Sequence, residues 1–312
     1  MKKKVGVCFS KELQGETPLS HIVGKLDVYM RLLELMSEAG WDVYILTRKT
    51  YRGDGIFDGS WIYKKGGFGL VRDRLKIDVV YDRTGGIDFP PAGDKLEVIN
   101  EREFKILAWD KWATFKVIGK YMPQTLLINE KKDLPKVLSK IKSDTVVLKP
   151  VNGLKGIGIY IGPKKRAMEF EFSNKYPQYI AQEFIDTDSG ISGIADGMHD
   201  LRIVIINGTP AMCHVRVPAK GSFVANAAQG GNLTEVDCQN IPGKIYKAVN
   251  EVSEIFSRKF NNPIYSLDFG VGKDGVPYIF EVNDQMGFPR WGMKNRDVFL
   301  RGIVENIALR LQ

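Results

Sequence analysis

The first hundred residues alternate between short apolar runs and a helical pattern, and this alternation constrains the fold most. Residues 5–9 form an apolar run, residues 26–39 have apolar side chains at helical spacing, and residues 41–46 form a second run. Strand, helix and strand in this order indicate a parallel α/β unit. Gly40 lies where a helix C-terminal glycine is common, and residues 76–81 supply another strand. We therefore expect a small doubly wound domain that binds ligands beyond the carboxyl ends of its strands.

The pattern changes near residue 109, where the strict alternation ends. The expected later helices are 111–120, 134–141, 245–260 and 298–311, and the expected strands include 145–149, 264–271 and 276–282. The last two strands are joined by Lys273-Asp274-Gly275, and Asp-Gly between apolar runs is a strong hairpin signal. The second part of the chain is therefore predicted to be α+β.

Length and charge limit the partners of the chain. The 312 residues leave room for roughly two domains and a ligand cleft between them. Lys and Arg number 45 against 37 Asp and Glu, and the net charge of +8 is consistent with anionic ligands such as nucleotides or simply with solubility. Because the basic residues are scattered and no aromatic residues interleave with them, we expect no nucleic acid partner.

The cysteines and apolar runs indicate the compartment. Cys8, Cys213 and Cys238 are an odd number without metal-ligand spacing, so neither a disulfide framework nor a zinc site is indicated. No apolar run approaches the length of a membrane span, and the run after the initial lysines is too short for a signal peptide. We expect a cytoplasmic protein without membrane association, and a homo-oligomer remains open.

The strongest polar group lies in the late hairpin. Asp268 falls on its first strand, and Glu281 and Asn283, two residues apart on the second, project from one face. The alternative is that the carboxylates simply face solvent, but both lie in very apolar strands where an unpaired carboxylate is costly. Hard cations prefer carboxylate and amide oxygens. The hairpin therefore predicts a site for magnesium, or for manganese in its place.

A buried strand ending at Lys149 precedes a glycine-rich loop over residues 152–158. Gly156 and Gly158 would let the backbone approach phosphates closely, and Lys149 and Lys155 would add positive charge. Such a loop can also be an ordinary turn between strands. It matches neither the P-loop nor the dinucleotide fingerprint, because no helix follows it. A nucleotide pocket of another type is therefore expected.

Two further regions offer polar groups to a ligand. One is an apolar strand whose end can present backbone groups to a base edge and an apolar wall to its ring; its residues are Gln182, Glu183, Phe184 and Ile185. The other contains Arg202, Arg216 on the next strand, and Asn226 beyond it. Arginines on neighbouring strands could hold phosphate or carboxylate oxygens, with surface salt bridges as the alternative.

Taken in order, these motifs resemble the ATP-grasp superfamily, in particular its amino-acid and peptide ligases, which include ribosomal-protein glutamate ligases and glutathione-synthetase-like enzymes. The matching segments are Trp109-Asp110-Lys111, Leu148-Lys149-Pro150, the glycine loop, Gln182 to Ile185, Asp200-Leu201-Arg202, and Asp268 with Glu281-Val282-Asn283. The resemblance spans nearly the whole chain. It implies a Rossmann-like amino-terminal domain over 1–108, a central subdomain with a glycine-rich lid over 109–186, and a carboxy-terminal subdomain with the metal site over 187–312. The two subdomains would clasp ATP.

The resemblance also implies a role for each candidate residue. Lys111, Lys149, Lys155, Gly156 and Gly158 would bind the ATP phosphates, Gln182 to Ile185 would surround adenine, Asp268, Glu281 and Asn283 would hold the metal, and Arg202, Arg216 and Asn226 would act on the transferred phosphoryl group. The carboxylate that holds the ribose is assigned to Asp188, in competition with Asp186 and Asp196.

The implied reaction is ATP-dependent ligation of a small-molecule acid, an amino acid or peptide, to an amine through an acyl phosphate. Phosphoryl transfer needs alignment and charge neutralisation, which accounts for the lack of a nucleophile motif. Alternatives are a small-molecule kinase that uses the same ATP site and a nucleotide-binding structural or coat-associated protein without turnover. Arg83, at the end of an early strand, and Arg290, after the metal strand, are the candidates for acid recognition.

Overall fold

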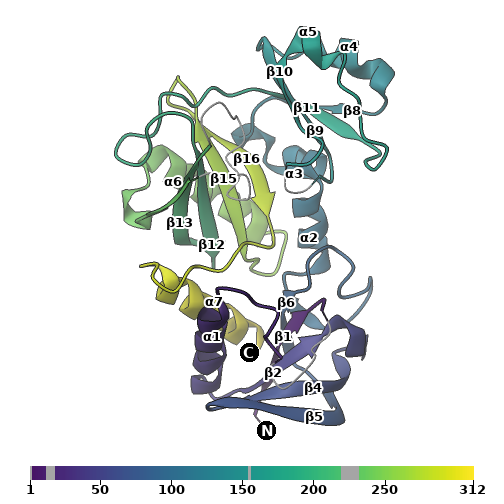
Figure 1. The fold of residues 1–312 in the computed structure, drawn as a ribbon, viewed down its shortest axis with the longest axis vertical. Coiled ribbons are helices and arrows are strands. Elements are labelled where there is room, and N and C mark those ends of the chain that lie inside the picture. Colours follow the sequence, from purple (N-terminus) through teal and green to yellow (C-terminus); the bar gives the residue numbers. More distant parts are fainter. Residues whose placement is uncertain (1, 12–17, 154–155, 219–231) are drawn as a thin grey trace.

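The computed structural model describes the chain except for residue 1 and residues 12–17, 154–155 and 219–231. The described strands form three sheets, of seven, four and five strands. In Figure 1 the seven-stranded sheet lies at one end of the molecule, the four-stranded sheet at the other, and the five-stranded sheet between them. Lys155 and Asn226 lie outside the described residues.

The seven-stranded sheet contains the predicted parallel unit. Its strands are β1 (Lys4–Phe9), β2 (Asp42–Thr47), β3 (Tyr51–Gly53), β4 (Ile56–Lys64), β5 (Gly67–Lys76), β6 (Val79–Arg83) and β7 (Glu97–Ile99). Strands β2, β1, β6 and β7 are parallel neighbours, and α1 (Leu26–Glu38) connects β1 to β2. The sequence pattern did not indicate the antiparallel hairpin of β4 and β5, which extends the sheet beyond β2.

The four-stranded sheet has the order β10–β9–β11–β8 and is antiparallel at β10–β9, β9–β11 and β11–β8. Its strands are β8 (Thr125–Ile128), β9 (Thr145–Pro150), β10 (Tyr160–Pro163) and β11 (Tyr179–Glu183), with α4 (Leu134–Leu138) and α5 (Lys164–Ala167) alongside. Its buried apolar residues form a separate cluster drawn from residues 128–181. Helices α2 (Arg102–Trp109) and α3 (Lys111–Ile118) lead into it from the seven-stranded sheet.

The five-stranded sheet carries the predicted metal hairpin. Its order is β14–β13–β12–β15–β16, all antiparallel, with bounds β12 (Asp200–Ile206), β13 (Thr209–Val217), β14 (Asn232–Val236), β15 (Tyr265–Val271) and β16 (Pro277–Asn283). Helix α6 (Gly243–Ser257) packs on one face, because its buried side chains join those of the sheet in one apolar cluster. The opposite face carries Arg202 and Asp268, and further along β12 and β13 it carries the buried apolar residues Val204 and Met212.

Helix α7 (Arg296–Arg310), near the carboxyl end of the chain, packs on the amino-terminal part of the chain. It packs against α1 and also contacts β12 and β13. Phe299 and Ile303 of α7, Leu32 of α1, Val5 of β1 and Val204 of β12 all belong to one buried cluster. The amino-terminal sheet and the five-stranded sheet therefore share a hydrophobic core, whereas the predicted division into three domains stays a prediction.

The expectation about the cysteines needs a correction. Cys213 of β13 and Cys238 are joined by a disulfide, with their Cα atoms 5.6 Å apart, and Cys8 is buried and free. Cys213 lies opposite Val236 of β14, and the turn that follows brings Cys238 back over β13. The pairing depends on this register, so a separation of 25 residues carried no recognisable signal.

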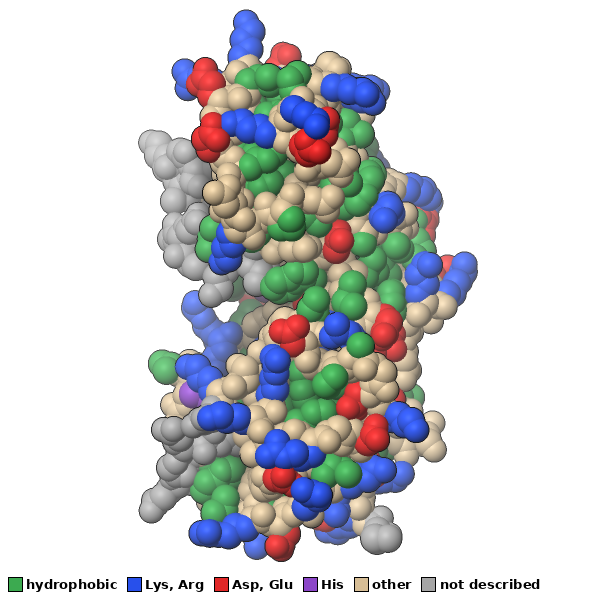
Figure 2. Space-filling view, turned by 90° about the vertical axis from the view of Figure 1, so that its right-hand side faces the viewer, with side chains coloured by type: hydrophobic (Ala, Val, Ile, Leu, Met, Phe, Trp, Pro, Cys, Tyr) green, Lys and Arg blue, Asp and Glu red, His purple; other side chains and the backbone are tan. Residues whose placement is uncertain are grey.

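The distribution of surface charge and the length of the helices concern the expectations about nucleic acid and membranes. Figure 2 shows positive and negative side chains interspersed on one face of the molecule, without a single basic stripe on that face. Among the described residues, no helix is both long and apolar enough to cross a membrane.

Candidate active site

A cavity of about 210 Å³ lies between the four-stranded and five-stranded sheets. Its walls come from β9, β11 and the segment after β11, from the glycine loop, and from β12, β15 and β16. The predicted residues that line it are Lys111, Lys149, Gly156, Gln182, Glu183, Phe184, Ile185, Asp268 and Glu281. Residues that the sequence placed far apart in the chain therefore meet at one cavity.

Part of the cavity lining is apolar. Ile157, Ile159 and Ile161 line it beside Phe184 and Phe280. Strand β11, which ends just before Phe184, is held in place because Gln182 donates from Nε2 to Thr125 Oγ1 at 2.9 Å. An apolar slot beside the end of a strand suits a flat, weakly polar ring, as predicted for the base.

Two buried lysines also line the cavity. Lys149 Nζ donates to Gln182 Oε1 at 2.9 Å and to the Phe280 carbonyl at 3.2 Å. Lys111 Nζ donates to the Gly153 carbonyl at 2.7 Å and lies 3.1 Å from Glu281 Oε1. Lys149 has no carboxylate partner at ion-pair distance among the described residues, so its charge is available to an anionic ligand.

Burial lowers the pKa of Lys149 to about 8, against the opposing charge of Glu281. Bound phosphates would raise this pKa again, so above pH 8 we expect nucleotide binding to take up part of a proton. Since the lysine is mostly protonated roughly one pH unit below its pKa, nucleotide affinity should be flat under about pH 7 and should fall above pH 8. Calorimetric titration with an ATP analogue in two buffers of different ionisation enthalpy measures the uptake.

The matched variant for this experiment is Lys149→Arg, because arginine keeps its proton throughout this pH range. We expect the proton uptake to disappear in the variant while binding at pH 7 is retained to a measurable degree. Equal uptake by both proteins would contradict the assignment of the titrating group to Lys149.

Asp268 is the most constrained side chain of the site. Arg202 binds it with two hydrogen bonds, Nε to Oδ1 and Nη2 to Oδ2, each 2.6 Å. Arg216 donates to the same Oδ2 at 2.9 Å and also pairs with Asp200. Both pairs are directly opposite in the strand registers, Arg202 with Asp268 and Asp200 with Arg216. The antiparallel register therefore places the two arginines and two aspartates on one face.

The charges of this group shift the pKa values in opposite directions. Burial would raise the pKa of Asp268, but the charges and hydrogen bonds of Arg202 and Arg216 outweigh it and hold this pKa far below its usual range. Burial and the charge of Asp268 raise the pKa of Asp200 to about 7. Asp268 is therefore the permanently ionised member of the pair.

Oxygen donors for a cation gather next to Asp268. Glu281 lies directly opposite it in β16, and Asn283 donates from Nδ2 to Asp268 Oδ2 at 3.3 Å, which leaves its side-chain oxygen without a partner among the described residues. Two carboxylates and an amide oxygen are a donor set that fits a magnesium ion. No group of three or more His, Cys, Asp or Glu side chains arranged to hold a metal occurs in the described part of the chain.

The other predicted nucleotide residues lie at different distances from the cavity. Gly156 (φ +75°) lines it, whereas Gly158 (φ +76°) lies behind, where an added Cβ would be 3.1 Å from Pro150. Asp188 is exposed and does not line the cavity. Thr187, its neighbour, does line it, so the ribose assignment to Asp188 gains no support from the geometry.

Three polar residues of the site had no assigned role in the sequence prediction: Asp200 was only part of a matching segment, and His199 and His214 were interpreted as structural. Asp200 and His199 line the cavity, and His199 Nε2 accepts from the Val271 amide at 3.0 Å, which anchors the segment before β12. His214 lies opposite Arg202, and its buried Nδ1 has no hydrogen-bond partner among the described residues. Burial and the charges of Arg202 and Arg216 lower the pKa of His214 to about 4. A signal was available in the sequence, because Arg202 and Arg216 were expected on neighbouring strands, and residues beside or opposite them then lie close to the site.

The two candidates for acid recognition lie outside the cavity. Arg83 donates from Nη2 to the Met286 carbonyl at 3.1 Å, and Arg290 is exposed four residues further along the chain. Arg290 lies in the segment that follows β16, and Arg83, from the amino-terminal sheet, contacts the same segment.

Comparison with known proteins agrees with the order of motifs. The model of the prokaryotic glutathione synthetase ATP-grasp domain matches residues 110–256. A glutathione synthetase from Prochlorococcus marinus is 25% identical over 261 residues, covering 77% of this chain and 81% of the relative. A probable alpha-L-glutamate ligase from Alcanivorax borkumensis is 22% identical, covering 65% and 68%.

The three-dimensional comparison covers the whole chain. A RiPP-associated ATP-grasp ligase from Chryseobacterium gregarium, solved with ADP and a leader and core peptide, superposes with a TM-score of 0.64. It is 13% identical, and the superposition covers 99% of this chain and 97% of the other. This confirms the predicted fold class.

The chain has the ATP-grasp fold, and its residues 110–256 match the ATP-grasp domain of prokaryotic glutathione synthetases. Within that class the chain is an ATP-dependent ligase that forms a C–N bond, similar to glutathione synthetases and glutamate ligases. The resemblance stated from the sequence is thereby confirmed.

Proposed function

We propose that the enzyme transfers the γ-phosphoryl group of ATP to the carboxylate of an amino acid or peptide and then joins the resulting acyl group to an amine. In the first step a carboxylate oxygen bonds to the γ-phosphorus and the bond to ADP breaks. In the second step the amine nitrogen bonds to the acyl carbon, phosphate leaves, and the amine releases a proton. ATP, acid and amine thus give an amide, ADP and phosphate.

The observation that carries the proposal is that Lys149, Lys111, Asp268 and Glu281 line one cavity, while Arg202 and Arg216, which do not line it, both bind Asp268. Lys149 and Lys111 would neutralise the phosphates. Arg202 Nη1 and Arg216 Nη1 have no partners among the described residues, so these donors can bind the oxygens of the transferred group. Preorganised cations of this kind stabilise the charge that develops in phosphoryl transfer.

Asp268, Glu281 and Asn283 would hold magnesium, with manganese as a possible replacement. When bound, the ion would neutralise phosphate charge and orient the phosphate oxygens. The contacts of Asp268 with two arginines would keep its carboxylate ionised and correctly turned for this role. Lys111, already beside Glu281, would link the metal ligands to the phosphates.

Amino-acid or peptide substrates are supported by the relatives, a glutathione synthetase, a glutamate ligase and a ligase solved with a peptide. Acid and amine would enter from the side of Arg202 and Arg216, since the apolar part of the cavity suits the base. The cytoplasmic location and the oligomeric state stay predictions.

The test is a phosphate-release screen that crosses a panel of acids with a panel of amines in the presence of magnesium and ATP. We expect ADP formation to require both partners, and mass measurement should find the amide. ADP formation that needs only one hydroxyl compound, with a stable phosphorylated product, would instead establish the small-molecule kinase. Bound ATP that is never turned over would support the structural alternative.

A further inference from the structure

Four polar side chains form a square on the face of β12 and β13 that carries Asp268's partners. Asp200 and Arg202 are two residues apart on β12, and Arg216 lies directly opposite Asp200 on β13. His214 likewise lies opposite Arg202. Residues two apart on a strand share a face, so the four side chains lie together. We call Asp200, Arg202, His214 and Arg216 the polar square. Because Asp200 lines the cavity, the polar square adjoins the proposed nucleotide site.

The arginines occupy one diagonal of the polar square, and two hydrogen-bond acceptors, Asp200 and His214, occupy the other. Diagonal neighbours on paired strands lie about 7–8 Å apart, within reach of one small group between them. The side chains of Arg202 and Arg216 are 18% and 12% exposed, so the polar square is not sealed from ligands. It therefore offers donors to an anion and acceptors to an N–H group at the same place.

Both acceptors have unused capacity. Arg216 binds Oδ2 of Asp200, whereas the buried Oδ1 has no hydrogen-bond partner among the described residues. His214 is only 7% exposed, and its Nδ1 likewise lacks a partner in the described part of the chain. Burial and the charges of Arg202 and Arg216 lower the pKa of His214 to about 4, so its neutral ring has a lone pair to offer. Two buried acceptors without partners at one place indicate that a polar ligand binds there.

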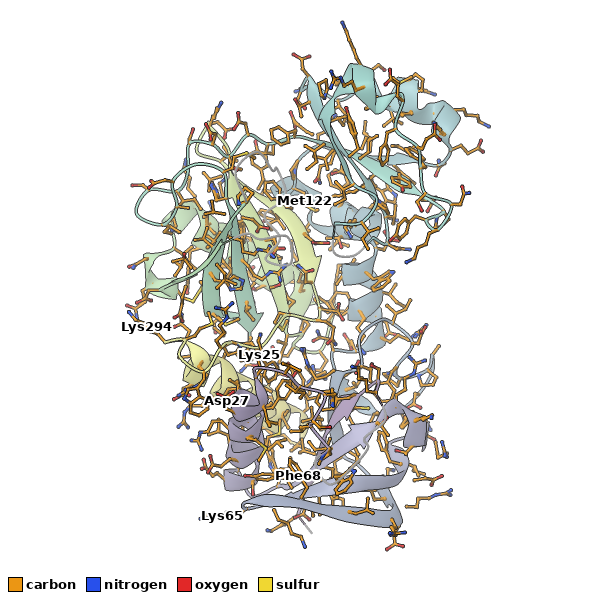
Figure 3. The ribbon with its side chains drawn as sticks, viewed as in Figure 1. Lys25, Asp27, Lys65, Phe68, Met122 and Lys294 are labelled. Carbon is orange, nitrogen blue, oxygen red and sulfur yellow. A yellow bond between two sulfur atoms is a disulfide. The ribbon has the colours of Figure 1, made fainter. Side chains whose placement is uncertain are left out.

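Glu235 of β14 lies on the other side of His214 but is engaged elsewhere. It is opposite His214 in the strand register, and its carboxylate accepts from the backbone amides of Lys294 and Asn295, each at 2.9 Å. Figure 3 shows Lys294 where the five-stranded sheet meets the segment that leads to α7. Glu235 thus fastens this segment to the sheet and leaves the His214 ring unpaired.

We propose that Asp200 and His214 bind the attacking nitrogen of the amine substrate, beside an acyl phosphate held by Arg202 and Arg216. This inference rests on the proposed function and assigns the amine site within it. A neutral primary amine has two N–H donors and one lone pair. When both N–H groups donate to the two acceptors, the lone pair is left for the acyl carbon. A secondary amine has a single N–H and leaves one acceptor unpaired, so the substrate class is a primary amine.

The first experiment measures the preference for primary amines. Each amino acid that serves as the amine in the phosphate-release screen is compared with its N-methyl form, for example glycine with sarcosine, at saturating magnesium, ATP and acid. The primary amine should have a kcat/KM at least roughly tenfold higher, because the N-methyl form leaves a buried acceptor unpaired. Equal kcat/KM values within every pair overturn the inference.

The second experiment removes the acceptor on β13. His214→Leu should raise the KM for the amine roughly tenfold and reduce the preference over the N-methyl form, since leucine accepts no hydrogen bond. His214→Asn, whose side-chain oxygen can take the place of Nδ1, should restore most of both. The matched control is His21→Leu, at a partly exposed histidine of the amino-terminal part, which should change neither value. Equal losses with primary and N-methyl amines in His214→Leu would show a structural role and overturn the inference.

Hydroxylamine separates this inference from the proposed function. It attacks acyl phosphates without needing a binding site and converts them to hydroxamates. Wild-type enzyme supplied with magnesium, ATP, hydroxylamine and the panel of acids should therefore form a hydroxamate. Absence of both hydroxamate and ADP with every acid would disprove the ligase reaction itself. Hydroxamate formation together with an unchanged amine KM in His214→Leu would disprove only the amine site.

Discussion

Glu281→Gln should lower the rate of acid-dependent and amine-dependent phosphate release by roughly a hundredfold to a thousandfold. Glu281 is one of two carboxylates in the proposed metal site, and it also lies 3.1 Å from Lys111. Glutamine keeps the size of the side chain but loses the charge that holds the ion, and metal stabilisation of phosphoryl transfer amounts to several kcal/mol. The measurement is steady-state phosphate release over a range of magnesium concentrations.

Two controls define this result. Glu305→Gln, on the exposed side of α7, should leave the rate unchanged. Higher magnesium concentrations should recover part of the activity of Glu281→Gln if the loss comes from weaker metal binding. Undiminished phosphate release by this variant would require the metal assignment to be abandoned.

Lys105→Met should lower the free energy of unfolding by about 3–5 kcal/mol, the usual effect of removing one partner of a buried ion pair. Lys105 of α2 and Asp82 of β6 are fully inaccessible to solvent and form an ion pair, and Lys105 also donates to the Phe89 carbonyl at 2.6 Å. Methionine fills the space but leaves the Asp82 charge buried without its partner. Denaturant unfolding at neutral pH provides the measurement.

The matched surface variant is Lys247→Met, whose lysine is largely exposed and lies 3.9 Å from Glu251. It should change stability by less than about 0.5 kcal/mol. The double variant Asp82→Leu/Lys105→Met should regain much of the loss, because apolar side chains of similar size often replace a buried pair without penalty. A stable Lys105→Met single variant would show that Asp82 finds another partner or a proton.

The sequence was informative where function depends on local pattern. Strand periodicity placed Glu281 and Asn283 on one face, and the Asp-Gly turn paired their strand with that of Asp268. Lys149 at the end of a buried strand was likewise predicted to face the nucleotide, and it lines the cavity. These inferences need only the alternation of side chains and the direction of neighbouring strands.

Features that depend on how distant strands and helices align could not be predicted from the sequence. Arg202 and Arg216 were predicted to bind phosphate, but their direct clamp on Asp268 follows from a cross-strand alignment that no sequence motif reveals. Lys25 meets Phe288 across 263 residues, only because α1 packs against α7. Asp188 illustrates the same limit, since the fold of its loop turns Thr187 toward the cavity instead.

The shared core of α1 and α7 has a consequence for movement around the nucleotide. Displacing the amino-terminal sheet from the five-stranded sheet would open a cluster that includes Leu32, Val204 and Phe299. The four-stranded sheet keeps its own apolar cluster, so turning it as a body disturbs much less packing. We therefore expect any opening of the cavity to be a rotation of the four-stranded sheet against a base formed by both ends of the chain.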